Sequence, residues 1–79
     1  VFGIRFKLTD LPFEIGDTMY VGIKDFYKDA GNFSLIFFNG ATELKRVNAT
    51  VTSPITYLTS IIPEETTDIQ IRTVQHGPQ

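Results

Sequence analysis

The side chains that could carry out acid–base chemistry are few, and their positions do not suit catalysis. His76 is the only histidine, and a general base needs a fixed position close to the proton that it removes, whereas we expect His76 to lie in a solvated tail. Glu64, Glu65 and Asp68 form an acidic cluster that is typical of a solvated turn. The sequence therefore predicts no catalytic residues and a protein that is not an enzyme.

Neither a metal site nor a nucleotide site is predicted. Asp25 and Asp29 lie in a charged segment that lacks the D-x-D-x-D-G spacing of a calcium-binding loop. The sequence has no cysteine, which excludes disulfides and cysteine-ligated zinc. It also has no glycine-rich loop of the kind that holds phosphates. We therefore expect no cofactor and no bound metal.

The net charge and the hydropathy pattern limit the kinds of partner that we expect. Seven Lys and Arg against nine Asp and Glu give a net charge of −2 and a pI of about 5.1, and the basic residues are scattered, which argues against nucleic acid. No apolar run approaches the roughly 20 residues of a membrane-spanning helix. Two N-x-S/T triplets begin at Asn32 and Asn48. They make both residues candidate N-glycosylation sites and favour an extracellular, secreted protein.

Apolar and polar residues alternate with a period of two through most of the chain, which is typical of β-strands. We predict a turn over residues 12–17 and a type I′ hairpin turn at Asn39-Gly40, because Asn-Gly is the strongest short-range hairpin signal. The predicted strands cover residues 2–9, 18–23, 32–38, 41–52, 55–62 and 69–74.

This pattern predicts an all-β protein, an antiparallel β-sandwich of six to seven short strands. Its 79 residues suffice for one small domain. We expect residues 1–75 to form a single sandwich domain or part of a larger one, and residues 76–79 to be a frayed tail. The expected core comprises Phe6, Leu8, Val21, Phe33, Leu35, Phe37, Ile69 and Ile71.

The predicted strand at residues 32–38 is apolar on both faces, since Ile36 and Phe38 lie opposite Phe33, Leu35 and Phe37. It should be a central strand covered on both sides, or a strand whose second face meets another chain. We therefore expect a homo-oligomer, or docking to a preceding segment, through this face or through open strand edges.

Several short motifs follow one another in an order that resembles the C-terminal half of a galectin-type (S-type lectin) domain. In that family a W-G-x-E-x-R segment leads to P-F-x-x-G, an F-x-V/I-x-V/F-N-G hairpin, a strand with arginine, I-x-x-L-x-I and a closing G-D-V/I-x-L/I-x-S/T-V. The corresponding segments here are "FG" at residues 2–3, "PF" at 12–13, Gly16, "NFSLIFFNG", Glu43, Arg46, "ITYLTSI" and "DIQIRTVQ". The resemblance implies a galectin-like or jelly-roll sandwich that binds a glycan.

The sugar-binding motif of the family is altered in this chain. Its Trp, which stacks on galactose, corresponds to Phe2, its Glu to Arg5 and its Arg to Lys7. These three residues are therefore the candidate ligand-binding site. Arg5 donates hydrogen bonds where the family has an acceptor, and the family's H-x-N-P-R sequence is absent, so the usual galactoside network is not expected. Alternation also places Phe2 on the apolar strand face, opposite Arg5 and Lys7.

Two functions from different classes remain open. The first is a non-enzymatic recognition module, galectin-like, whose partner is a glycan or a protein. The second is a structural or adhesion module, such as an immunoglobulin-like spacer of a larger extracellular or virion protein, although the Cys…Trp…Cys signature of true immunoglobulin domains is absent.

Overall fold

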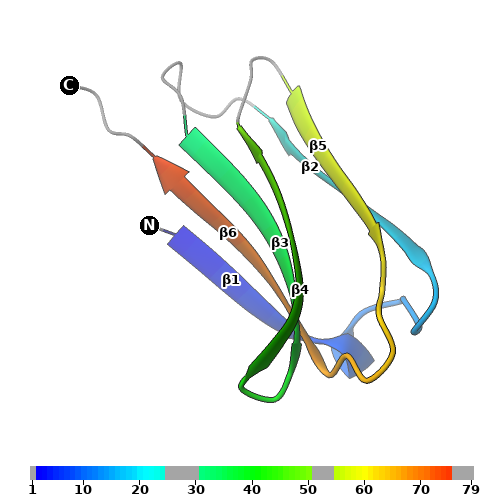
Figure 1. Cartoon of the computed structure of the whole chain (residues 1–79). Coiled ribbons are helices and arrows are strands. Elements are labelled where there is room, and N and C mark those ends of the chain that lie inside the picture. Colours follow the sequence, from blue (N-terminus) through cyan, green and yellow to red (C-terminus); the bar gives the residue numbers. More distant parts are fainter. Residues whose placement is uncertain (1, 25–30, 51–54, 76–79) are drawn as a thin grey trace.

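The computed structural model of this chain describes residues 2–24, 31–50 and 55–75 (Figure 1). The predictions for Asp25, Asp29, His76 and the 76–79 tail lie outside these residues. Within the described ranges, no helix has the length and apolar character needed to cross a membrane.

In the described part of the chain, six strands form two antiparallel sheets, which confirms the predicted all-β sandwich-like fold. The four-stranded sheet has the order β1-β6-β3-β4, and the two-stranded sheet pairs β2 with β5. The strands are β1 (Phe2–Lys7), β2 (Thr18–Lys24), β3 (Gly31–Asn39), β4 (Thr42–Thr50), β5 (Ile55–Ile61) and β6 (Asp68–Gln75).

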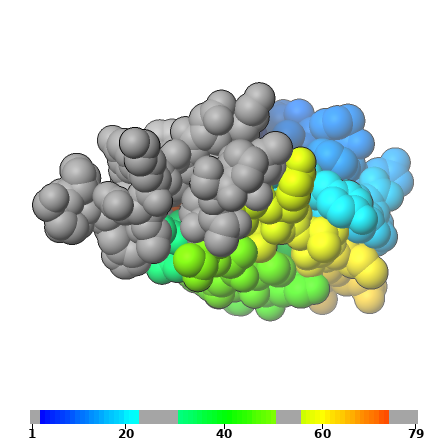
Figure 2. All heavy atoms as spheres, turned by 90° about the horizontal axis from the view of Figure 1, so that it is seen from above, coloured from blue at the N-terminus to red at the C-terminus, as the bar shows by residue number. Residues whose placement is uncertain are grey.

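The two-stranded sheet packs closer to the β4 edge of the four-stranded sheet than to its β1 edge. Seen from above, the yellow atoms of β5 lie between the cyan atoms of β2 and the green atoms of β3 and β4 (Figure 2). β1 is the edge strand at the far side of the larger sheet. Its inner face is consequently less well covered, with Ile4 43% exposed and Phe6 only half-buried.

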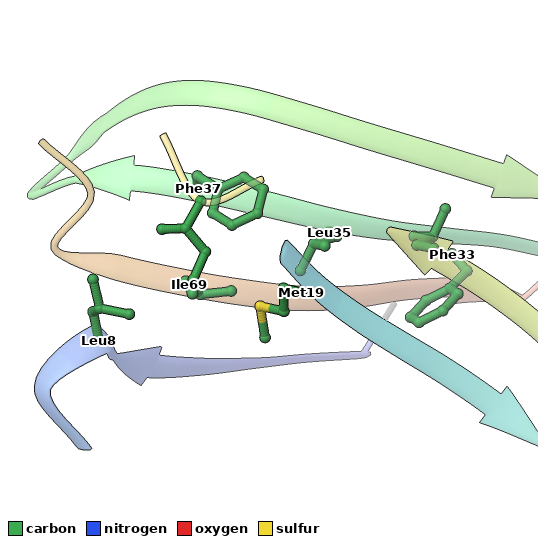
Figure 3. Packing of buried hydrophobic residues seen from close by; sticks show 8 residues of the cluster. Leu8, Met19, Phe33, Leu35, Phe37 and Ile69 are labelled. Atoms are coloured by element: carbon green, nitrogen blue, oxygen red, sulfur yellow. The ribbon is translucent and has the colours of Figure 1, made fainter. Parts of the chain in front are cut away.

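The hydrophobic core fills the space between the two sheets, where side chains of β3 meet those of β6 and β2 (Figure 3). Leu8, Phe33, Leu35, Phe37 and Ile69 are buried as predicted. Phe6, Val21 and Ile71 are only half-buried, because β1 is an edge strand and the smaller sheet has just two strands. The core also contains Met19, Leu58 and Ile62.

The first strand ends at Lys7, two residues earlier than the alternation predicts. Leu8 to Asp10 form a short 3₁₀ helix, η1, and the Leu8 amide donates to the Thr67 carbonyl at 2.9 Å. The predicted turn over residues 12–17 is present. Asp17 accepts a hydrogen bond from the Glu14 amide at 2.8 Å, and Gly16 has a φ of +93°.

The hairpin between β3 and β4 is not the predicted type I′ turn. Asn39 is paired with Thr42, so the two-residue loop consists of Gly40 and Ala41. Gly40 has a φ of +57°, whereas Asn39 and Ala41 are not among the residues with positive φ. Because a type I′ turn needs positive φ at both loop positions, this pattern fits type II′, which has glycine first. Asn39 stays in the ladder, and the loop is displaced by one residue.

A β-bulge at Leu44 interrupts the pairing of β4 with β3. Phe37 is opposite Lys45, yet Phe38 is opposite Glu43, so Leu44 is an extra residue. In a regular strand, residues three apart point to opposite faces. The bulge instead brings Glu43 and Arg46 together, with Oε1 and an Nη atom 2.8 Å apart.

The second face of β3 is covered within the chain itself. Ile36 is 1% exposed, and its cross-strand neighbours are the long polar side chains Arg46 and Gln70. Phe38 is half-buried, with the Arg5 guanidinium carbon 4.3 Å from its ring centre. The aliphatic stems of long side chains can cover apolar surface in this way. The expected apolar patch at Ile36 and Phe38 is therefore not exposed.

Candidate functional site

The candidate site is the face of the four-stranded sheet that points away from the smaller sheet, which we call the outer face. Its residues are fixed by the strand register: Lys7, Asp68, Phe38 and Glu43 form one row, Arg5, Gln70, Ile36 and Arg46 the next, and Gly3, Arg72, Ser34 and Asn48 the third. All three arginines of the sequence thus lie on this one face.

Arg5, one of the sequence-predicted ligand residues, is engaged by the protein itself. Its Nε donates to Asp68 Oδ2 at 3.3 Å, and an Nη atom donates to the Gly40 carbonyl. The guanidinium also lies above the Phe38 ring at 4.3 Å, a cation–π contact. Arg5 therefore connects β1 to β6 and to the hairpin, and this structural role competes with ligand binding.

The other two sequence-predicted residues are less constrained by what the structure shows. Lys7 is exposed and opposite Asp68 on the outer face, and no hydrogen bond or ion pair of Lys7 is found within the described residues. Phe2 opens β1 and its backbone is paired with Thr73, but its side chain lies outside the described part of the molecule. The structure thus places Arg5 and Lys7 on one face and leaves the role of Phe2 a prediction.

The carboxyl of Asp68 is stabilised in its ionised form. The Thr67 hydroxyl, which donates to Asp68 Oδ1 at 2.7 Å, is the main cause of the lowered pKa of Asp68, and the positive charges of Arg5 and Lys7 lower the pKa further. On β4, the hydrogen bonds from Arg46 likewise hold the pKa of the Glu43 carboxyl below its ordinary value. Two of the three arginines on the outer face thus have ionised carboxylate partners.

The lowered pKa of Asp68 predicts a specific acid dependence of stability. A carboxyl with a lower pKa in the folded state stabilises the fold above its unfolded pKa of about 3.9, and this contribution is lost as the pH falls through the folded pKa. We expect the urea midpoint of wild type to fall more steeply below about pH 4 than that of Asp68→Asn. Parallel pH profiles for the two proteins would contradict this linkage.

A hollow of about 330 Å³ opens on the outer face between β6, β3 and β4. The described residues that line it are all polar: Asn32, Ser34, Arg46, Asn48 and Arg72. The Ser34 hydroxyl donates to Asn48 Oδ1 at 2.6 Å and fixes the orientation of that amide. Amide, hydroxyl and guanidinium groups on neighbouring strands of one sheet form a rigid array of hydrogen-bonding groups.

Sequence reasoning did not assign these residues to a binding site. The only available signal is that Asn32 and Ser34, and likewise Arg46 and Asn48, are two residues apart and therefore share a strand face. Arg72 lies on β6, so its place beside these four residues can be inferred only when it is known that β6 and β4 are the two neighbours of β3.

The two candidate glycosylation sites lie close together on this face. Asn32 and Asn48 are exposed residues of adjacent strands, and both line the hollow. Glycosylation at either asparagine stays a prediction, and a glycan attached to Asn48 would occupy the hollow.

A larger hollow of about 650 Å³ lies over η1 and the segment that follows it, and it is lined by Leu8, Thr9, Leu11, Pro12, Phe13, Glu14 and Ile15. Its lining residues all come from one continuous segment, residues 8–15. It lacks the convergence of polar groups from several strands that distinguishes the outer face.

Fold and site together define an all-β sandwich-like protein with a polar, arginine-bearing sheet face. No family model matches the sequence, and comparisons with curated proteins and with solved structures find no match. The resemblance to galectins therefore depends on the order of the sequence motifs alone.

Proposed function

We propose that this chain is a non-enzymatic recognition module, galectin-like in kind, that binds a carbohydrate on the outer face of its four-stranded sheet. The observation that carries the proposal is the hollow lined by Asn32, Ser34, Arg46, Asn48 and Arg72. Sugar hydroxyls both donate and accept hydrogen bonds, and amide and hydroxyl side chains do the same. The volume of about 330 Å³ lies at the lower end of the range for small-ligand sites.

A glycan array on the purified chain tests this proposal. We expect a subset of glycans to bind wild type and to be lost in Asn48→Phe, which fills the hollow from the exposed strand β4. Tyr57→Ser is the matched control, because it removes an exposed ring from the other sheet. An array without bound glycan, or with the same glycans on wild type and Asn48→Phe, would overturn the proposal.

Simple galactosides are expected to bind weakly. The acceptor that the galectin family uses is replaced by Arg5, whose guanidinium is already bonded to Asp68 and Gly40. We expect lactose to bind no tighter than the millimolar range, measured by calorimetric titration. Were Phe2, Arg5 and Lys7 a remnant of the galectin sugar site, Phe2→Ala would abolish any lactose binding that is present, with its melting curve recorded to separate lost binding from lost folding. Micromolar affinity for lactose in wild type would contradict this expectation.

A second candidate function is a structural or adhesion module with a protein partner, and an observation on the smaller sheet favours it. Tyr20, Tyr57 and Ile61 on the outer side of β2 and β5 are 73%, 65% and 57% exposed. Tyr57 lies against Gly22, since a Cβ built on Gly22 would be 2.9 Å from the Tyr57 ring. A homo-oligomer, or docking of a preceding segment, would use this face or an open strand edge. Loss of partner binding in Tyr57→Ser, with the array unchanged, would favour this function.

A further inference from the structure

The three arginines of the outer face differ in whether they have an acidic partner. Arg5 is bonded to Asp68, and Arg46 is bonded to Glu43 through two nitrogens at 2.8 and 3.1 Å. Within the described residues, Arg72 has neither a hydrogen bond nor an ion pair, although it is half-buried. A guanidinium has five N–H donors and cannot be deprotonated in a protein. Arg72 therefore carries a permanent positive charge whose donors have no partner among the residues that the structure describes.

The neighbours of Arg72 leave room around its side chain. In its row of the sheet it lies between Gly3 on β1 and Ser34 on β3, both small residues. The Gln70 side chain lies over Gly3, because a Cβ built on Gly3 would be 2.8 Å from Gln70 Nε2. A ligand group that reaches Arg72 would thus approach from the Ser34 side, where the hollow opens.

The hollow offers more donors than acceptors. The Ser34 hydroxyl occupies Asn48 Oδ1, and the amide nitrogen of Asn48, which has no partner within the described ranges, can donate to a ligand. Arg46 uses two nitrogens on Glu43 and keeps further N–H groups. Among the residues that the structure describes, no carboxylate lines the hollow. Although the chain as a whole has a net charge of −2, two guanidinium groups line the hollow, and Arg72 has no acidic partner within the described residues, which suits an oxyanion.

We propose that this hollow binds an acidic saccharide, whose carboxylate or sulfate pairs with Arg72 while its hydroxyls contact Asn32, Ser34 and Asn48. The proposal rests on the proposed carbohydrate-binding function and specifies the ligand class. The planar guanidinium matches a carboxylate or sulfate through two parallel hydrogen bonds, and charge-assisted hydrogen bonds of this kind are the stronger ones. The short polar residues beside Arg72 fit the hydroxylated remainder of such a ligand.

The test uses three forms of one disaccharide, neutral, with a uronic acid and with a sulfate ester, titrated into the unglycosylated chain at about 0.15 M salt. We expect at least one acidic form to bind about tenfold or more tightly than the neutral form, as a hydrogen bond to a charged group contributes enough for this difference. The two acidic forms separate a carboxylate from a sulfate ligand. Equal affinity for all three forms would overturn the proposal.

Substitutions at Arg72 test whether this residue causes the tighter binding of the acidic form. Arg72→Gln should lower affinity for the acidic form about tenfold and leave the neutral form within about twofold, and Arg72→Lys should restore part of the loss. The matched control is Lys45→Gln, which removes one positive charge from an exposed position of β4 outside the hollow. A loss in Lys45→Gln as large as in Arg72→Gln would show a diffuse charge effect and overturn the proposal.

Two further outcomes distinguish a failure of the acidic-ligand proposal from a failure of the proposed carbohydrate-binding function. Binding of neutral glycans alone, unaffected by Arg72→Gln, would overturn the acidic ligand and leave the carbohydrate-binding function standing. Absence of all glycan binding would overturn both. Should Arg72→Gln fail to fold, as judged from its melting curve, Asn48→Asp on exposed β4 places a carboxylate in the hollow and should cause the same selective loss.

Discussion

Leu35→Ala is expected to lower the free energy of unfolding by about 2–5 kcal/mol, since it removes buried methyl groups and leaves a cavity. Leu35 is 0% exposed and lies on the central strand β3, with Val47 and Ile71 opposite it on the two neighbouring strands. A domain of this size has a total stability of only about 4–12 kcal/mol, so the variant loses a large part of it. Urea denaturation, with the midpoint and slope recorded for both proteins, measures the loss.

Leu44→Ala is the matched control, because it makes the same chemical change at the bulge of β4. Leu44 is 37% exposed, so we expect a loss of about 1 kcal/mol or less. If Leu35→Ala and Leu44→Ala shift the urea midpoint equally, the inner face of β3 does not form the core that the structure shows.

The fold class could be predicted because alternation is a local signal. Residues of a strand that share a face are two apart in the sequence, so the approximate strand ranges and much of the core follow from the pattern itself. The apolar character of β3 on both faces left two outcomes open, a central strand covered on both sides or a strand whose second face meets another chain, and in the structure β3 lies between β6 and β4 with Ile36 buried. What covers its second face could not be predicted, because Arg46 and Gln70 come from strands whose pairing with β3 is not a local property.

The same distinction explains the outcome for the candidate site. Alternation along β1 alone places Arg5 and Lys7 on one polar face, and the structure agrees. Arg72 and Asn48 join the same face only because β6 and β4 both pair with β3, and this order depends on long-range contacts. The bulge at Leu44 has no clear sequence signal. It brings Glu43 and Arg46 together, whereas Arg72 is the arginine without a partner in the described residues.

Gly40→Val is expected to destabilise the protein by about 1–3 kcal/mol, because a β-branched residue strongly resists positive φ. Gly40 has a φ of +57°, and no atom lies within 4 Å of a Cβ built there, so the cost is conformational and not steric crowding. Its amide donates to Thr67 Oγ1 at 2.8 Å and its carbonyl accepts from Arg5, which anchors the hairpin to neighbouring segments. In a domain of this size the melting temperature should fall by about 4 °C or more.

Two control variants separate the backbone requirement from other effects of substitution. Gly40→Asn should retain more stability than Gly40→Val, since asparagine tolerates positive φ better than β-branched residues do. Ala41→Val adds the same bulk at the next loop position, where φ is not positive, and should change stability by about 0.5 kcal/mol or less. A melting temperature of Gly40→Val within about a degree of wild type would mean that Gly40 does not have positive φ in solution. The turn would then not be of type II′, and Arg5 would lose the carbonyl that holds it to the hairpin.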